Sequence, residues 1–235
     1  MELLDRIAER PAEAALLLDV DGVLAPIVPR PEDALVPPET QAELRRLNER
    51  YALVGCVSGR AGDDARRIVG VPELVYVGNH GLELEDESPL WGARLLHFLG
   101  DIDWPELEDK GLTAALHYRN ARDEAAAERE LEQVADRARK AGFIARFGRK
   151  VLEILPPLHA NKGTAVRRLL VERGLERALY GGDDTTDLDA FRALEAFDLH
   201  VRVAVMSPEG PPALRDAADV VVDGPAEFLE LLRRL

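Results

Sequence analysis

The chain has 235 residues, of which 46% are apolar and 31% charged, a composition typical of a globular protein with one large domain or two small ones. Its formal net charge of -14 argues against a surface for nucleic acid or anionic membranes, because both need basic patches. No apolar segment approaches the length of a membrane span or signal peptide, and the single cysteine, Cys56, provides no disulfide framework, so we expect a cytoplasmic protein.

The first predicted strand is an apolar run that ends at two carboxylates, Asp19 and Asp21, followed by Gly22. Such a run predicts a buried parallel strand that carries both acids to its carboxyl end, where ligands bind in open α/β sheets. Two carboxylates this close persist as anions if a cation lies between them, and Mg²⁺ with substrate phosphate would satisfy the arrangement. A pair of solvated turn aspartates is the alternative for these residues alone.

Strands and helices alternate around this first strand. A short helix over residues 3–10 is expected before it. After it come a Pro-rich loop, a helix capped by Thr40, a strand over 52–57, a helix over 63–69 and a strand over 74–77. This alternation predicts the beginning of a doubly wound parallel sheet.

The regular alternation stops between residues 85 and 158, which we expect to form an inserted α+β cap. Within this segment the apolar periodicity predicts a strand over 112–119, a helix over 123–140, and a hairpin of two strands over 143–147 and 150–155.

Parallel-type alternation then resumes with a helix over 162–173 and an apolar run over 178–180. Later elements are a helix through Phe191, strands over 201–205 and 220–222, and a last helix from Pro225. The sequence therefore predicts an α/β protein with a doubly wound core, formed by residues 1–84 and 159–235, and the cap at 85–158.

Polar residues follow several of these elements. Ser58 ends the second strand, Lys162 begins a helix, and an acidic cluster over 183–187 follows a later strand. Together with Asp19 and Asp21, these residues resemble, in order and chemistry, the four signature motifs of haloacid-dehalogenase-type phosphatases. The resemblance implies a Rossmann-like core with a C2-type cap.

A closer resemblance, over nearly the whole chain, is to the trehalose-6-phosphate phosphatases. The stretches Gly78-Asn79-His80-Gly81 and Gly182-Asp183-Asp184-Thr185-Thr186-Asp187 are the most discriminating. Further matches are Asp19-Val20-Asp21-Gly22-Val23-Leu24-Ala25-Pro26-Ile27, Val57-Ser58-Gly59-Arg60, His117-Tyr118-Arg119 and Glu153-Ile154-Leu155-Pro156. The sequence departs from the family pattern at Val20, Val23 and Leu188, where Tyr, Thr and Glu are usual.

This resemblance implies roles for the four motifs. Asp19 would be the nucleophile that forms an aspartyl-phosphate, and Asp21 the general acid and later the general base. Ser58 would bind a phosphate oxygen and Lys162 would neutralise the nucleophile and phosphoryl group; the alternatives are a helix cap and a surface lysine. Mg²⁺ would be held by Asp19, the backbone carbonyl of Asp21 and Asp183. For Asp184 and Asp187, direct ligation, an outer contact and helix capping all stay open.

The expected activity is Mg²⁺-dependent hydrolysis of a small molecule, trehalose 6-phosphate. The resemblance suggests that the substrate is bound by Gly59, Arg60, Asn79, His80 and Glu83 from the core, and by His117, Arg119, Lys150 and Glu153 from the cap. A solvated polar face is the alternative for the cap residues. The alternative functions are a phosphatase for glucosylglycerate, mannosylglycerate or sucrose phosphates, or a non-catalytic module that binds sugar phosphates. The identity of any protein partner is left open by the sequence.

Overall fold

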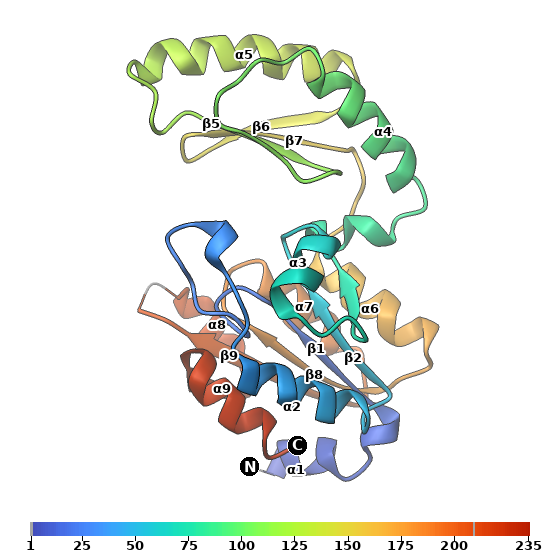
Figure 1. The fold of residues 1–235 in the computed structure, drawn as a ribbon. Helices are drawn as coiled ribbons and strands as arrows, with labels where there is room; N and C mark the ends of the chain where they lie inside the picture. The colour runs from blue at the N-terminus through green and yellow to red at the C-terminus, as the bar shows by residue number, and fades with distance from the viewer. Residues whose placement is uncertain (1, 209) are drawn as a thin grey trace. The chain divides into compact units, whose positions relative to one another are not determined.

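The computed structural model describes residues 2–208 and 210–235, which form two compact units (Figure 1). The larger unit contains the chain up to Gly81 and from Ala160 onwards, and the smaller unit spans Leu82–His159. From the sequence, the boundaries between the core and the inserted cap were expected at residues 84/85 and 158/159. No helix among the described residues is both long and apolar enough to cross a membrane.

A parallel sheet lies at the centre of the larger unit, with the strand order β10-β9-β8-β1-β2-β3. All five residues of β1 are buried, which explains why it is a continuous apolar run instead of an alternating pattern. The expected doubly wound sheet is therefore confirmed. Its strands are β1 (Ala14–Leu18), β2 (Leu53–Val57), β3 (Val75–Val77), β8 (Arg177–Gly182), β9 (Leu199–Met206) and β10 (Val220–Asp223).

Helices cover both faces of this sheet. One core cluster joins Leu16 of β1 and Leu179 of β8 to apolar residues of four helices: α1 (Glu2–Ala8), α2 (Pro38–Asn48), α3 (Gly62–Val69) and α9 (Gly224–Leu232). Side chains alternate along a strand, so Tyr180 points to the opposite face. There its ring meets Phe191 of α7 (Asp187–Leu194), with the centroids 6.1 Å apart. Helix α7 in turn packs against α6 (Lys162–Glu172) and α8 (Pro212–Ala217).

The prediction that Thr40 caps the N-terminus of a helix is wrong. Helix α2 begins at Pro38, and Thr40 lies inside its first turn with 5% of its surface exposed. Proline is favoured in the first turn of a helix, where its missing N–H costs no hydrogen bond, so Pro38 starts the helix two residues before the hydroxyl.

The smaller unit is an antiparallel sheet, β4-β5-β7-β6, with two helices packed on one face. Its core joins Leu95, Leu131, Leu116 and Leu152, one from each of four elements. The structure adds α4 and β4, for which the sequence predicted no element, and shortens the strand expected over 112–119. The elements are α4 (Ser88–Leu99), β4 (Leu107–Asp109), β5 (Ala114–His117), α5 (Glu124–Lys140), β6 (Ile144–Gly148) and β7 (Val151–Leu155).

Candidate active site

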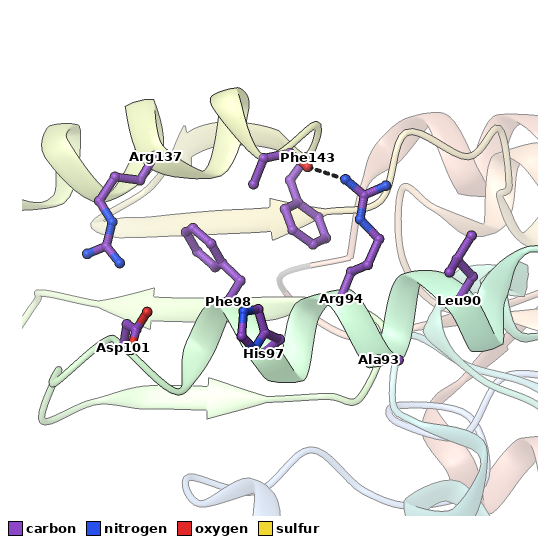
Figure 2. A pocket seen from close by; sticks show the side chains of 9 residues that line it. Leu90, Ala93, Arg94, His97, Phe98, Asp101, Arg137 and Phe143 are labelled. Atoms are coloured by element: carbon purple, nitrogen blue, oxygen red, sulfur yellow. Dashed lines mark hydrogen bonds between the residues drawn. The ribbon is translucent and has the colours of Figure 1, made fainter.

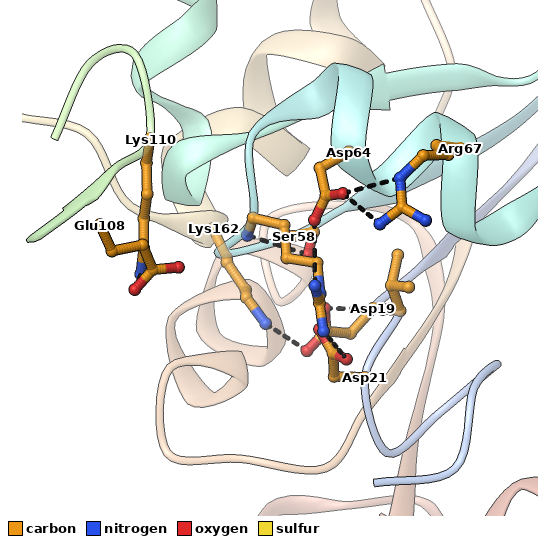
Figure 3. A network of polar contacts seen from close by, with 10 residues as sticks. Asp19, Asp21, Ser58, Asp64, Arg67, Glu108, Lys110 and Lys162 are labelled. Carbon is orange, nitrogen blue, oxygen red and sulfur yellow. Dashed lines mark hydrogen bonds and ion pairs between the residues drawn. The ribbon is translucent and has the colours of Figure 1, made fainter. Parts of the chain in front are cut away.

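The carboxyl end of β1 brings Asp19 to a buried cluster of charged side chains (Figure 3). The backbone N–H of Asp19 donates to Gly181 at 2.9 Å, which fixes the residue against β8. Its Oδ2 accepts a hydrogen bond from Lys162 Nζ at 2.5 Å, and Lys162 is only 2% exposed. Carboxylate oxygens of Asp19, Asp183 and Asp187 lie within 4.8 Å of one another. The structure thus gathers residues from three separate parts of the sequence.

Gly22 is required for this close approach. Its φ of +73° lies in the left-handed region, and a Cβ at this position would lie 2.0 Å from Oδ2 of Asp183. Any side chain here would therefore clash with Asp183 as well as strain the backbone. The glycine after the two aspartates allows the β1 loop and the β8 loop to meet.

Asp187 is fully buried and accepts four hydrogen bonds. Its Oδ1 accepts from Lys162 Nζ and from the hydroxyl of Tyr180, both at 2.7 Å. Its Oδ2 accepts from the backbone N–H groups of Asp183 and Asp184, both at 2.9 Å. An ionised carboxylate has about four acceptor sites, so these bonds use the capacity of Asp187. Asp187 therefore holds the lysine and the loop after β8 in place.

Tyr180 was not predicted from the sequence as a site residue. It occupies an apolar strand, where a tyrosine is first interpreted as a core residue, and its ring is indeed fully buried. The available signal was its hydroxyl, because a buried tyrosine hydroxyl needs a hydrogen-bond partner. Here that partner is the carboxylate which also binds Lys162.

The charges of the cluster do not balance. Burial raises the pKa of Asp19 to about 7, although the nearby Lys162 lowers it. Burial, with the charges of Asp19 and Asp187, raises the pKa of Asp183 to about 8. Burial alone would lower the pKa of Lys162, but the two neighbouring carboxylates raise it above its ordinary value. One ammonium thus faces three carboxylates.

Oxygen ligands and excess negative charge fit a divalent cation. Asp19 and Asp183 carry the unbalanced charge, whereas the oxygens of Asp187 are already occupied. Asp184 is exposed, and its Oδ1 accepts from the backbone N–H of Thr185 at 2.6 Å. The residues present therefore suit a hard metal ion held chiefly by Asp19 and Asp183.

Asp21 is held by a bidentate ion pair with Arg60. The Nε and Nη2 of the guanidinium donate to the two carboxylate oxygens at 2.6 and 2.9 Å. Arg60 also donates from Nη1 to Asp64 at 3.0 Å, and Asp64 accepts from Arg67 as well. Arg60 was expected to contact the substrate, and its pairing with Asp21 was not predicted from the sequence.

The loops after β2 and β3 lie side by side. Ser58 is 1% exposed, and its backbone oxygen accepts from the N–H of His80 at 2.9 Å. The N–H of Asn79 donates to Arg60 at 2.7 Å. Asn79 and His80 have φ values of 51° and 54°, a conformation uncommon outside glycine and typical of strained functional loops. A Cβ on Gly59 would lie 2.6 Å from the His80 ring, so any larger residue there would displace that ring.

The predicted substrate residues His117, Arg119, Lys150 and Glu153 belong to the smaller unit. Glu83, which was expected in the core, also belongs to the smaller unit, because that unit begins at Leu82. Because Leu116 and Leu152 face the helices, His117 and Glu153 project from the other face of the sheet. His117 lies 3.4 Å from Glu108, and Glu153 accepts from Arg146 at 2.7 Å.

Arg119 and Lys150 lie in turns at one end of this sheet, since the N–H of Tyr118 donates to the Lys150 carbonyl. Lys150 pairs with Glu124 at 2.6 Å, whereas Arg119 is exposed. Glu83 is exposed near the start of the unit. His117 and Glu153 thus lie on the helix-free sheet face, whereas Lys150 reaches Glu124 at the start of α5.

The parallel sheet with the separate antiparallel unit is the fold of the haloacid dehalogenase-like class. A haloacid dehalogenase-like hydrolase from Bacteroides thetaiotaomicron has this fold, with a TM-score of 0.60 and 15% identity over 94% of this chain and 98% of its own. The C-terminal domain of trehalose-6-phosphate phosphatase from C. albicans has a TM-score of 0.67 and 22% identity, covering 98% of this chain and 95% of that one.

Sequence comparison gives the family within this class. The trehalose-phosphatase family model matches residues 17–91 and 93–221. The probable trehalose-phosphate phosphatase 2 of Oryza sativa subsp. japonica is 30% identical over 94% of this chain and 67% of its own length. The chain belongs to the trehalose-phosphatase family.

Proposed function

We propose that this protein hydrolyses trehalose 6-phosphate to trehalose and phosphate in the cytoplasm, through a phosphorylated Asp19. The observation that carries the proposal is the 2.5 Å contact of Asp19 with Lys162 inside the acidic cluster, in a chain of the trehalose-phosphatase family. Relatives named for the same activity, such as the rice protein, support the choice of substrate.

In the first step, a carboxylate oxygen of Asp19 attacks phosphorus and forms the aspartyl-phosphate while the bond between phosphorus and the sugar oxygen breaks. Lys162 uses two of its three ammonium donors on Asp19 and Asp187. The third can donate to the transferring phosphoryl group, whose negative charge the ammonium offsets. The buried hydroxyl of Ser58 would bind another phosphoryl oxygen.

Asp21 would protonate the departing sugar oxygen and later take a proton from the water that hydrolyses the aspartyl-phosphate. Its carboxylate is oriented by the planar fork of Arg60, which binds both oxygens. Arg60 is thereby proposed as a positioning residue for Asp21 in addition to its expected contact with substrate.

Mg²⁺ is the proposed cofactor, held by the carboxylates of Asp19 and Asp183 and the backbone carbonyl of Asp21. When bound, the ion would offset the negative charge of the phosphoryl group and of the carboxylates. For Asp187 we propose a positioning role, because its oxygens already accept four hydrogen bonds. Asp184, which is exposed, is proposed to act outside direct ligation.

The smaller unit is proposed to be the cap that selects the sugar. Its helix-free face would supply His117 and Glu153 as hydrogen-bonding partners for sugar hydroxyls, and Arg119, Lys150 and Glu83 would supply further partners from elsewhere in the unit. Gly59, Asn79 and His80 from the larger unit would complete the site. A closing cap would also exclude water from the phosphoryl group.

A panel of phosphosugars, assayed by phosphate release with added Mg²⁺, tests the proposal. We expect the highest kcat/KM for trehalose 6-phosphate and no turnover by Asp19→Asn, while Asp63→Asn, an exposed acid of α3, keeps wild-type activity. Equal or better turnover of a glucosylglycerate, mannosylglycerate or sucrose phosphate would replace trehalose 6-phosphate as the substrate. Absence of turnover on the whole panel would favour the alternative function, a non-catalytic module that binds sugar phosphates.

A further inference from the structure

A cavity of about 540 Å³ lies between helices α4 and α5 of the smaller unit (Figure 2). Leu90, Phe98 and Phe143 supply apolar and aromatic walls, and the guanidinium groups of Arg94 and Arg137 line the same space. Its volume lies within the range of about 300–1,000 Å³ usual for small-molecule sites. All lining residues belong to the smaller unit, whereas the acidic cluster belongs to the larger one.

Arg94 is held in a fixed position. Its guanidinium lies over the Trp91 ring, 4.0 Å from the centroid, and donates to the carbonyl of Ala141 at 2.5 Å. Trp91 belongs to the core of the unit and packs edge-on against Phe143 at 5.2 Å. A positive charge is therefore held at one side of the cavity by groups that are themselves anchored.

Arg137 supplies a second positive charge. It extends from α5 into the space between the helices, with its guanidinium 5.7 Å from the Phe98 centroid. Within residues 2–208 and 210–235 its side chain has no hydrogen bond or ion pair, although Asp101 lines the same cavity. The side chain of His97, also a lining residue, has no hydrogen bond in this part of the chain either. The guanidinium donors of Arg137 are thus available to a ligand.

Aromatic walls with two guanidinium groups match one class of ligand. An aromatic ring can stack on or against Phe98 and Phe143, while an attached acidic group binds Arg137 by charge-assisted hydrogen bonds and the charge of Arg94 favours an anion in the cavity. A simple inorganic anion would leave the apolar walls uncovered. A neutral apolar molecule would leave the guanidinium of Arg137 without an acceptor.

We propose that the cavity between α4 and α5 is a binding site for an aromatic organic anion, separate from the acidic cluster of the larger unit. One molecule would bind per chain, with its ring at Phe98 and Phe143 and its acidic group at Arg137.

The probe for this site is anilinonaphthalene sulfonate, whose fluorescence rises in apolar surroundings. We expect one saturable site per chain. Arg137→Gln should weaken binding about tenfold or more, because a hydrogen bond to a charged group is lost. The matched control is Arg129→Gln, which removes the same charge from an exposed position of α5 outside the cavity. Its affinity should stay within about twofold of wild type.

Two comparisons complete the test. Phenylnaphthylamine, which lacks the sulfonate, should bind wild type about tenfold more weakly than the sulfonate and should not distinguish wild type from Arg137→Gln. Inorganic phosphate with Mg²⁺ should not displace the sulfonate. Equal losses in the two arginine variants, displacement by phosphate or binding without saturation would overturn the proposal. Equal thermal unfolding of both variants, expected for exposed side chains, ensures that a loss reflects the site.

Discussion

Acidification should release the divalent cation from the Asp19–Asp183 site well above the usual pH range of a carboxylate. The cation binds deprotonated carboxylates, so protons compete with it at pH values near and below the pKa values of its ligands. Those values are raised to about 7 for Asp19 and about 8 for Asp183. If both protons must leave, the apparent affinity falls about twentyfold from pH 9 to pH 7 and on the order of a thousandfold by pH 6.

The metal-free chain should become less stable as the pH rises and these two carboxyl groups lose their protons. A group whose pKa is raised on folding stabilises the folded state while it is protonated, and this contribution is lost as the pH rises through its folded pKa. For Asp19 and Asp183 the window begins at the ordinary pKa of 3.8 and ends at about 7 and about 8, respectively. The free energy of unfolding contributed by these groups should therefore fall through that window, and saturating Mg²⁺ should remove the fall.

Isothermal titration of Mg²⁺ in two buffers with different heats of ionisation measures both the affinity and the protons released. We expect release of between one and two protons per ion near neutral pH, on the order of the partial protonation of the two carboxyls. Asp183→Asn should remove most of the affinity and of the release, while Asp189→Asn, whose carboxylate pairs with Arg192, should behave as wild type. Affinity that does not change between pH 6 and pH 9, without proton release, would refute the reasoning.

Three further predictions follow from single contacts. Tyr180→Phe removes one hydrogen bond to Asp187, so kcat should fall about tenfold with KM unchanged, in steady-state assays at saturating Mg²⁺; a selective rise in KM would contradict the positioning role. Gly22→Ala places a methyl group against Asp183 and should weaken Mg²⁺ binding about tenfold or more by titration, whereas wild-type affinity would show that the loop yields without cost. Burial raises the pKa of Asp219, but hydrogen bonds from its arginine partner lower it below its ordinary value. Its stabilising effect is present above the unfolded pKa and lost as the pH falls through the folded one, so Asp219→Asn should flatten the acid side of a denaturation profile; an unchanged slope would contradict this.

The parallel sheet could be predicted because its strands are short apolar runs that stop at polar turns. All residues of β1 and β2 are buried, and this is why each appears as an unbroken apolar segment. Helix α5 was equally clear, since its apolar positions repeat at helical spacing and Asp123 caps its first turn.

Helix α4 was missed for a physical reason. Trp91, Leu95 and Leu99 face the core, but Leu90 and Leu96 are 59% and 68% exposed. Apolar residues on more than one side of a helix hide the periodicity that distinguishes a core face. The exposed Leu90 also lines the cavity between α4 and α5.

The sequence located the candidate site but not its connections. The motifs identified Asp19, Lys162 and Asp183, since their order along the chain is characteristic. The bidentate pair of Arg60 with Asp21 joins residues 39 positions apart, and no local pattern encodes the direction of a guanidinium. Such pairings depend on how the loops after β1 and β2 lie together, which only the folded structure provides.

The claim that Asp19 accepts the phosphoryl group is tested most directly by trapping the enzyme during turnover of radiolabelled trehalose 6-phosphate. After rapid acid quenching and proteolysis, we expect label on the peptide that contains Asp19 in wild type, and none in Asp19→Asn. Label on another residue, or single-turnover release of phosphate with no labelled peptide at any time, would contradict the account.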